Sequence, residues 1–215
     1  MTEVALFPIP NCVVFPGMIF PLHVFEPRYR TMIKHCMEHH MPVAICHTEK
    51  TLHHSGPHEH LTEALNSNQD TYKPKSVFGA GLCELYETLE DGRMLINVHV
   101  DTRYRLRQIQ QTLPFNIAEC EELKDDPSQD DQQLAELKDK VMHRLLALSA
   151  DEQDVQDILH SQAWEEMEPL KFSFAVFGLI RLEPDIQQAI LEQTQAAQRL
   201  QLMLNVLNQP PDSPL

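Results

Sequence analysis

Glycine and positive charge are both scarce in this sequence. It has 6 glycines in 215 residues, and they are too scattered to form a GxxxxGK[ST] phosphate-binding loop. Lysine and arginine number 17 against 32 aspartates and glutamates, which gives a formal net charge of -15. Nucleic acids and anionic membrane surfaces attract proteins through lysine and arginine. We therefore expect no ATP-binding loop, no nucleic acid partner and no membrane partner.

Cysteine is present without the spacings that give it a structural role. The cysteines are odd in number and widely spaced, and no two form a CxxC pair. Each lies among apolar neighbours, so we expect buried free thiols in a reducing cytoplasm. These residues are Cys12, Cys36, Cys46, Cys83 and Cys120.

Long apolar runs and catalytic motifs are missing as well. No apolar stretch approaches the roughly 18 residues that a membrane helix needs, and the N-terminus lacks the pattern of a signal peptide. Neither GxSxG nor HExxH occurs in the sequence. The sequence thus predicts a cytoplasmic protein that is not an enzyme and needs no cofactor.

What is present first is an apolar N-terminal segment that proline interrupts every few residues. Proline cannot donate to a strand ladder or continue a helix. Because a segment this apolar must still be buried, the pattern predicts short strands that bend at each proline and wrap a small barrel. At Pro16-Gly17, proline presets φ and glycine allows a positive φ, which predicts a turn. The prolines are Pro8, Pro10, Pro16, Pro21 and Pro27.

One helix and several strands are predicted after this segment. Pro27 suits the first position of a helix, and apolar residues then recur at helical spacing as far as His40. Asp91-Gly92 predicts a hairpin, and the strand after it is long enough that we expect a bend or bulge. Residues 47–75 have almost no periodicity, so we expect mostly a long surface loop. Strands are predicted at residues 43–46, 77–86, 93–107 and 115–120.

A long, ordered string of motifs runs through the first half of the chain. Its parts are Leu6-Phe7-Pro8, Val13-Val14-Phe15-Pro16-Gly17-Met18, Pro21-Leu22, Phe25-Glu26-Pro27-Arg28-Tyr29-Arg30, Val77-Phe78-Gly79-Ala80-Gly81-Leu82 and Arg103-Tyr104. The string resembles the N-terminal, substrate-binding domain of the Lon ATP-dependent protease family. The resemblance implies an α+β fold in which a PUA-like β pseudo-barrel, with one or two helices, precedes an α-helical bundle. It ends before the ATPase and serine–lysine protease modules of Lon would begin, so we expect a stand-alone form without those activities.

The second half is predicted to be helical. A polar segment at 123–130 marks the boundary between a β pseudo-barrel at 1–122 and a helical bundle at 131–208. Apolar residues there recur at spacings of three and four, and from Pro184 onward they predict one long helix. Residues 209–215 are predicted to be a disordered tail. In the resemblance, this half is similar to the helical subdomain that follows the barrel.

Histidines suggest an alternative function. His35 and His39 lie four apart on the polar face of the predicted helix, a spacing that can hold two metal ligands. His58 and His60 can add ligands from the loop. A functional zinc site usually has tighter ligand spacing, so a solvated helix face beside a histidine-rich loop is the favoured interpretation, and no metal is expected.

Two further groups have both a binding and a structural interpretation. Arg103, Arg105 and Arg107 form a basic row on the predicted outer face of a strand, where they contact an anionic partner or pair with neighbouring acids. Cross-strand pairing is favoured. Three apolar residues are candidates to line a groove for an extended apolar peptide, because methionine adapts to varied partners. These are Met18, Phe20 and Met32, and ordinary core packing is the favoured interpretation for them.

The resemblance implies binding and not catalysis. We expect a polypeptide-binding or adaptor protein in protein quality control, which engages unfolded or extended segments through apolar patches or an exposed strand edge. A Lon-type protease and a second copy of the chain are further expected partners. The alternatives are a metal-binding protein and an interaction subunit dedicated to one folded partner. In the latter, residues 123–215, with 17 acids against 7 lysines and arginines, carry the specificity.

Overall fold

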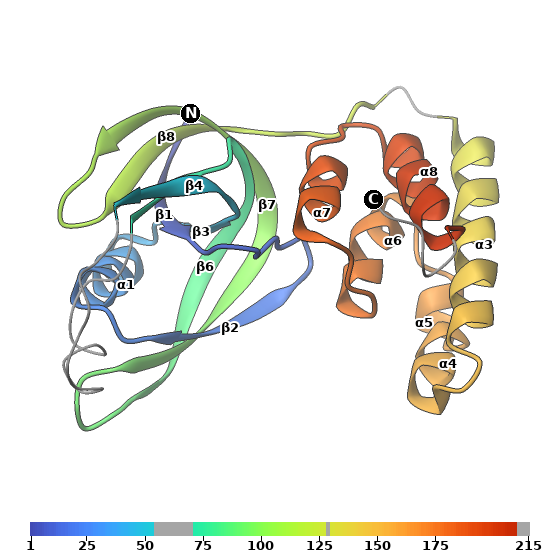
Figure 1. Ribbon diagram of the computed structural model, residues 1–215, viewed down its shortest axis with the longest axis horizontal. Helices are drawn as coiled ribbons and strands as arrows, with labels where there is room; N and C mark the ends of the chain where they lie inside the picture. Colours follow the sequence, from blue (N-terminus) through green and yellow to red (C-terminus); the bar gives the residue numbers. More distant parts are fainter. Residues whose placement is uncertain (54–70, 128–129, 210–215) are drawn as a thin grey trace. The chain divides into compact units, whose positions relative to one another are not determined.

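The computed structural model describes residues 1–53, 71–127 and 130–209. The chain divides into two compact units, Met1–Leu123 and Lys124–Leu215. Strands dominate the first unit and helices form the second, so the predicted α+β class is confirmed (Figure 1). The first unit contains β1 (Thr2–Pro8), β2 (Ile19–Val24), α1 (Pro27–His39), β3 (Val43–Cys46), β4 (Thr48–His53), β5 (Thr71–Pro74), β6 (Val77–Thr88), β7 (Met94–Gln111) and β8 (Asn116–Glu122).

The main sheet of the first unit closes on itself. Its strand order is β2-β7-β6-β3-β1-β8, and β8 also pairs with β7, which completes a ring. The long strand β7 curves through Figure 1 and pairs with β2 over residues 94–99, with β6 over residues 94–105 and with β8 over residues 104–111. The register shifts twice against β6 and twice against β8, which confirms the predicted bulges. Since the ring closes without it, β2 is left as an edge strand.

The turns predicted from glycine are confirmed. Gly17 and Gly92 have φ values of +93° and +81°, where a Cβ would be strained. The Met18 N–H donates to the Phe15 carbonyl at 3.2 Å and closes the turn around Pro16-Gly17. Each turn therefore ends one segment and directs the chain into β2 or β7.

The core of the first unit lies on both faces of β1 and β3. These strands run parallel and are buried on both sides. One face packs against α1 through Tyr29, Met32, Ile33 and Cys36. The other face buries smaller residues, and its cluster consists of Val4, Leu6, Ala44, Cys46, Phe78, Ala80, Tyr104, Ala118 and Cys120. The helix thus covers one side of the sheet, and the small residues fill the other.

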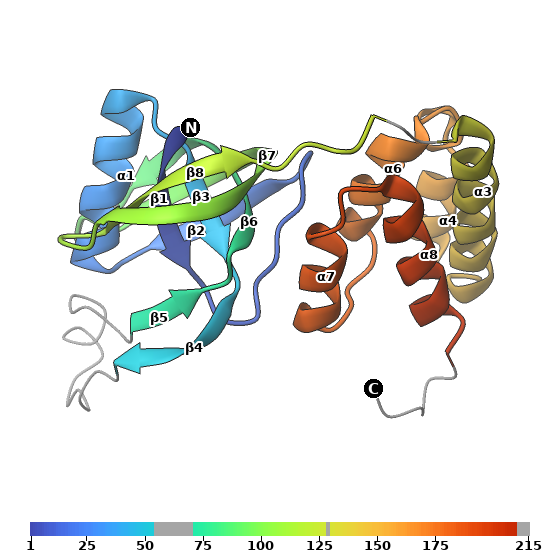
Figure 2. The same ribbon diagram turned by 90° about the horizontal axis from the view of Figure 1, so that it is seen from above.

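The predicted loop at 47–75 is wrong at both of its ends. Thr48–His53 and Thr71–Pro74 are the strands β4 and β5, which pair antiparallel as a separate two-stranded sheet (Figure 2). Register shifts interrupt this pairing, so the strands carry no regular alternation that a sequence pattern would show. Residues 54–70 lie outside the described part of the chain.

The second unit is a set of short helices. They are α3 (Asp131–Leu148), α4 (Gln153–Leu159), α5 (Gln162–Glu165), α6 (Pro169–Ala175), η1 (Val176–Gly178), α7 (Pro184–Leu191) and α8 (Ala196–Leu207). Phe172, Phe174 and Phe177 are buried, and Trp164 meets Phe172 edge-on with ring centroids 5.8 Å apart. These aromatic rings therefore form part of the core of the second unit. No helix in the described part of the chain is long and apolar enough to cross a membrane.

The single long helix predicted from Pro184 is wrong. The chain forms α7 and α8 with a break at residues 192–195. In the break, the Gln193 carbonyl accepts from the Arg199 guanidinium at 2.9 Å, and the Thr194 carbonyl accepts from the Asp126 N–H at 2.8 Å. These bonds take carbonyls that a continuous helix would use internally, which explains the interruption.

Candidate functional site

The candidate site is the solvent-facing side of β2, β7 and β6, together with the open edge of β2. Residues that pair across antiparallel strands lie on the same face. Ile19 pairs with His99, which pairs with Leu82, and Pro21 pairs with Asn97, which pairs with Glu84. We call this surface the open face, and it consists of Ile19, Pro21, His23, Leu82, Glu84, Tyr86, Asn97 and His99.

Pro21 identifies which backbone groups of β2 point away from β7. The Val100 N–H donates to the Met18 carbonyl at 2.9 Å, so the backbone N–H and C=O groups of the even-numbered residues in β2 point toward β7. Proline lacks an N–H and is tolerated in a strand where that group would face outward. Residues two apart share this orientation, so the N–H groups of Ile19 and His23 also point outward. No strand in the described ranges pairs with this edge of β2.

Exposed apolar side chains lie on the open face, Ile19 on β2 itself and Leu82 and Tyr86 on β6, with β7 between the two strands. Tyr86 is 78% exposed, Ile19 is 61% exposed and Leu82 is 46% exposed. Leu85 pairs with Ile96 and Glu87 with Leu95, which leaves Tyr86 as the extra residue of a bulge. A depression of about 460 Å³ lies next to it, lined by Pro21, Leu22, His23, Tyr86, Leu95, Ile96 and Asn97. The open face thus combines unpaired backbone with apolar contact area.

The sequence analysis missed Leu82 and Tyr86, although a signal was available. Both alternate with Glu84 on the polar side of β6, where apolar residues are not needed for the core. Their neighbours on the face are polar and pair with each other, since His99 Nε2 lies 3.1 Å from Glu84 Oε2. Apolar residues on a polar strand face would have marked this surface.

The described residues show little that suits nucleophilic or metal chemistry. Burial raises the pKa of Cys12 to about 11 and the pKa of Cys36 and Cys120 to about 12, and it raises those of Cys46 and Cys83 as well. A thiol with a raised pKa is a poor nucleophile at neutral pH. Within residues 1–53, 71–127 and 130–209, no group of three histidine, cysteine or carboxylate side chains is arranged to hold a metal.

The predicted peptide groove is only partly supported by burial. Met32, on the inner face of α1, has no exposed surface and packs in the core, so its assignment to an open groove is wrong. Helical periodicity turns its side chain inward with Tyr29 and Cys36. Met18 and Phe20 are half-buried and pack against the same core, next to β7.

The prediction of buried free thiols is confirmed for Cys36, Cys46 and Cys120, whereas Cys12 and Cys83 are half-buried.

The predicted basic row is interrupted. Arg103 is 4% exposed, so its placement on the outer face is wrong. It lies opposite Gly79 in β6. Arg105 and Arg107 are exposed, and Arg107 Nε donates to Glu121 Oε2 on β8 at 2.8 Å. Cross-strand pairing is thus confirmed for Arg107.

The two histidines of α1 lie together. The rings of His35 and His39 stack with centroids 4.1 Å apart, and His39 Nδ1 lies 2.9 Å from the His35 carbonyl oxygen. His35 also lies near Phe115, at 5.6 Å between ring centroids. His58 and His60 fall outside the described residues, so a metal site that includes them stays a prediction.

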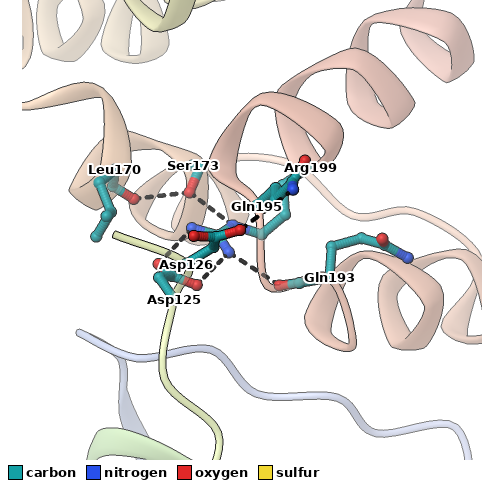
Figure 3. A network of polar contacts seen from close by, with 7 residues as sticks. All are labelled: Asp125, Asp126, Leu170, Ser173, Gln193, Gln195 and Arg199. Atoms are coloured by element: carbon teal, nitrogen blue, oxygen red, sulfur yellow. Dashed lines mark hydrogen bonds and ion pairs between the residues drawn. The ribbon is translucent and has the colours of Figure 1, made fainter. Parts of the chain in front are cut away.

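The second unit contains a buried polar network that the sequence analysis missed (Figure 3). Arg199 has no exposed surface, and its guanidinium makes a bidentate ion pair with Asp125 at 2.6 and 2.7 Å. Its Nε donates to Ser173 Oγ at 2.9 Å, and its Cζ lies 4.1 Å from the centroid of the Phe174 ring. Asp125, assigned to a linker from its polarity, is therefore bonded into the helical unit.

Comparisons with known proteins agree with this architecture. A family model described as the ATP-dependent protease La (LON) substrate-binding domain matches residues 3–209. The solved Lon N-terminal domain protein from Xanthomonas campestris has a TM-score of 0.62 and 18% identity, over 95% of this chain and 98% of that one. The N-terminal domain of Mycobacterium avium complex Lon protease has a TM-score of 0.68 and 13% identity, over 96% and 98%. No curated protein gives a significant match.

At such low identities the two solved structures establish the fold alone. The family model, in contrast, spans almost the entire sequence, including both units and the motif string at the N-terminus. The chain belongs to the Lon substrate-binding domain family.

Proposed function

We propose that this protein binds unfolded or extended polypeptide segments on the open face, without catalysing a reaction on them. The observation that carries the proposal is the open edge of β2. An extended segment can add to such an edge as a further strand, and its main-chain hydrogen bonds do not depend on its sequence. The apolar side chains of Ile19, Leu82 and Tyr86 then add contact area.

Pro21 sets the strength of this binding. It removes one of the outward N–H groups of β2, so an added strand finds donors only at Ile19 and His23 within that strand. Proline on an edge also limits uncontrolled pairing between copies of a protein. The expected binding is therefore weak and reversible, as suits a protein that samples many clients.

The cellular role that follows is that of an adaptor in cytoplasmic protein quality control. Unfolded clients expose both backbone and apolar side chains, which folded proteins bury. The family's description as a substrate-binding domain supports this role. A Lon-type protease or a second copy of this chain would be the partner that receives or shares the client.

Fluorescence anisotropy with labelled casein, an unstructured protein, tests the proposal. The wild-type chain should bind casein in the micromolar range. Replacing Ile19→Thr and Tyr86→Ser together removes apolar area and keeps residues compatible with a strand, so binding should weaken by about fivefold or more. Ile109→Thr is the matched control, because Ile109 is 39% exposed on the second half of β7, away from the open face.

A second pair of variants separates backbone from side-chain recognition. His23→Pro removes an outward N–H, and His23→Ala removes the same side chain but keeps that donor. The His23→Pro variant should bind casein more weakly than the His23→Ala variant does, and both variants should melt near the wild-type temperature. Absence of casein binding at high micromolar concentration, or equal weakening by Ile109→Thr, would contradict the proposal. Copurification of one stoichiometric partner would favour the dedicated interaction subunit instead.

A further inference from the structure

The second unit has an apolar crevice of about 130 Å³ beside α4. This volume is well below the roughly 300–1,000 Å³ of small-molecule pockets, so the crevice suits one side chain and not a whole ligand. Leu148, at the end of α3, is 52% exposed beside it, although its neighbour Leu145 is buried. The apolar lining consists of Leu145, Leu148, Val155, Leu159, Leu179, Ile180 and Leu207.

Acidic side chains accompany the crevice. Glu152 lines it, and Asp151, Asp154 and Asp157 lie within the same turn and helix. All four are exposed, and within the described residues none forms an ion pair with a lysine or arginine. One carboxylate in the first turn of α4 is accounted for by the helix dipole. Asp157 Oδ1 accepts from Gln153 Nε2 at 2.7 Å within α4, and Asp151 and Glu152 add negative charge at the start of the helix.

Three of the seven lysines and arginines of this unit are used inside it. Lys138 donates to the carbonyls of Glu165 and Met167 at 2.6 and 2.7 Å, and Arg144 donates to the Leu207 carbonyl at 2.9 Å. Arg199 is held by Asp125. Residues 124–215 hold 17 acids against 7 lysines and arginines, so these internal bonds leave the surface strongly negative.

We propose that this crevice is a second docking site, which takes one branched apolar side chain flanked by lysine or arginine from a partner polypeptide. The apolar side chain enters between Leu148 and Val155, and the flanking cations remain at the solvent-exposed carboxylates. Charge complementarity selects this occupant, because an acidic segment would be repelled. The inference rests on the proposed function only in taking a polypeptide as the occupant, and it uses a different surface.

Three fluorescein-labelled twelve-residue peptides test it on the full chain by anisotropy. Each is built on glycine and serine: one has a central leucine between lysines, one has leucine between glutamates, and one has serine between lysines. Only the first should bind, and its affinity should fall several-fold between about 50 and 300 mM NaCl because salt screens exposed charges. Equal binding of the glutamate or the serine peptide overturns the proposal, as does no binding of the first.

Charge variants locate the site. Asp151→Asn, Glu152→Gln and Asp154→Asn together should weaken binding of the lysine–leucine peptide by at least about tenfold. The matched control, Glu165→Gln with Glu166→Gln and Glu168→Gln, makes the same change in net charge in the same unit and should change the affinity by less than about twofold. Equal loss in both triples would mean attraction to net charge alone and would refute a site at the crevice.

The crevice itself needs a variant that keeps the charges. Leu148→Ser removes exposed apolar surface and should weaken binding of the lysine–leucine peptide. The unfolding transition of the second unit, followed by the fluorescence of Trp164, should be unchanged. The Ile19→Thr and Tyr86→Ser variant should bind this peptide like wild type. If casein binding fails while the peptide still binds, the open face is wrong and the crevice stands; the reverse result eliminates the crevice alone.

Discussion

The two units satisfy their polar groups in different ways. In the first unit, strand pairing around a ring uses the backbone donors and acceptors, and two clusters of apolar side chains form the core. In the second, short helices end frequently, and each end leaves carbonyls without intrahelical partners. Buried or half-buried cations satisfy several of them, including Lys138 at α5 and Arg144 at α8.

This difference explains where each unit is available for binding. A ring leaves few free backbone groups, and β2 keeps an unpaired edge because it pairs with β7 from outside the ring; β4 and β5 lie outside the ring as a separate pair. The helical unit uses three of its cations, Lys138, Arg144 and Arg199, in internal bonds, and carboxylates outnumber the cations that remain at its surface. Backbone-directed binding is therefore expected on the first unit and charge-directed binding on the second.

Intrinsic fluorophores allow the units to be followed separately. The tyrosines are Tyr29, Tyr72, Tyr86 and Tyr104, all in the first unit, and the only tryptophan is Trp164, in the second. Urea unfolding followed at tyrosine and tryptophan wavelengths, with circular dichroism for the strands, therefore reports on each unit.

The largest effect is expected from Arg199→Met. The change removes a buried cation and leaves the Asp125 carboxylate, 14% exposed, without its bidentate partner. Breaking a buried ion pair costs about 3–5 kcal/mol. The free energy of unfolding of the second unit, followed by Trp164 fluorescence, should fall by that amount, so its transition moves to lower urea concentration. The tyrosine transition should be nearly unchanged. Arg181→Met, at an exposed arginine, is the control and should be close to neutral. A wild-type Trp164 transition in Arg199→Met would contradict the importance of the network.

A smaller effect, in the first unit, is expected from Gly81→Ala. A Cβ at Gly81 would lie 1.7 Å from the His99 carbonyl oxygen, so the β6–β7 pairing must shift. Forcing atoms into packed structure costs about 1–3 kcal/mol. The circular dichroism signal of the strands should be lost at a lower urea concentration, with the Trp164 fluorescence transition unchanged. Gly178→Ala, where nothing lies within 4 Å of the added Cβ, should leave both transitions in place; if it destabilises the protein equally, steric contact is not the cause.

The smallest effect concerns pH. All the cysteines lie in the first unit, and burial raises the pKa of Cys12 to about 11 and of Cys36 to about 12, from 9.0. The folded state therefore keeps protons that the unfolded chain loses, so stability is intact below pH 9 and falls as pH rises toward 11–12. The first unit should unfold at lower urea at about pH 9.5 than at pH 7.5, with less change in the second. Cys36→Ala should reduce this difference; an equal alkaline shift in both units would contradict it.

Much of the first unit could be predicted from the sequence because its signals are local. The strand Val43–Cys46 has the predicted bounds, and Asp91-Gly92 forms the predicted turn. Proline and glycine restrict φ wherever they occur, so their effects do not depend on distant residues. The motif string that indicated the family also consists of local signals, so it could be recognised without knowledge of distant residues.

The open face could be predicted only in part. An exposed strand edge was expected, but its position on β2 follows from the closure of the ring by β7 and β8. Tyr86 projects from the face because of a bulge, and the register that creates it is set by β7. Pairing partners are distant in sequence, so periodicity within one strand does not identify them.

By itself, the sequence determined the fold class, the family, most of the strands and the turns at Gly17 and Gly92. Tertiary structure alone decided that Met32 and Arg103 are buried, that the helix from Pro184 breaks, and that Asp125 is bonded to Arg199. The physical reason is that turns and apolar faces depend on neighbouring residues. A charge can be buried only beside a partner, and here that partner lies 74 residues away along the chain.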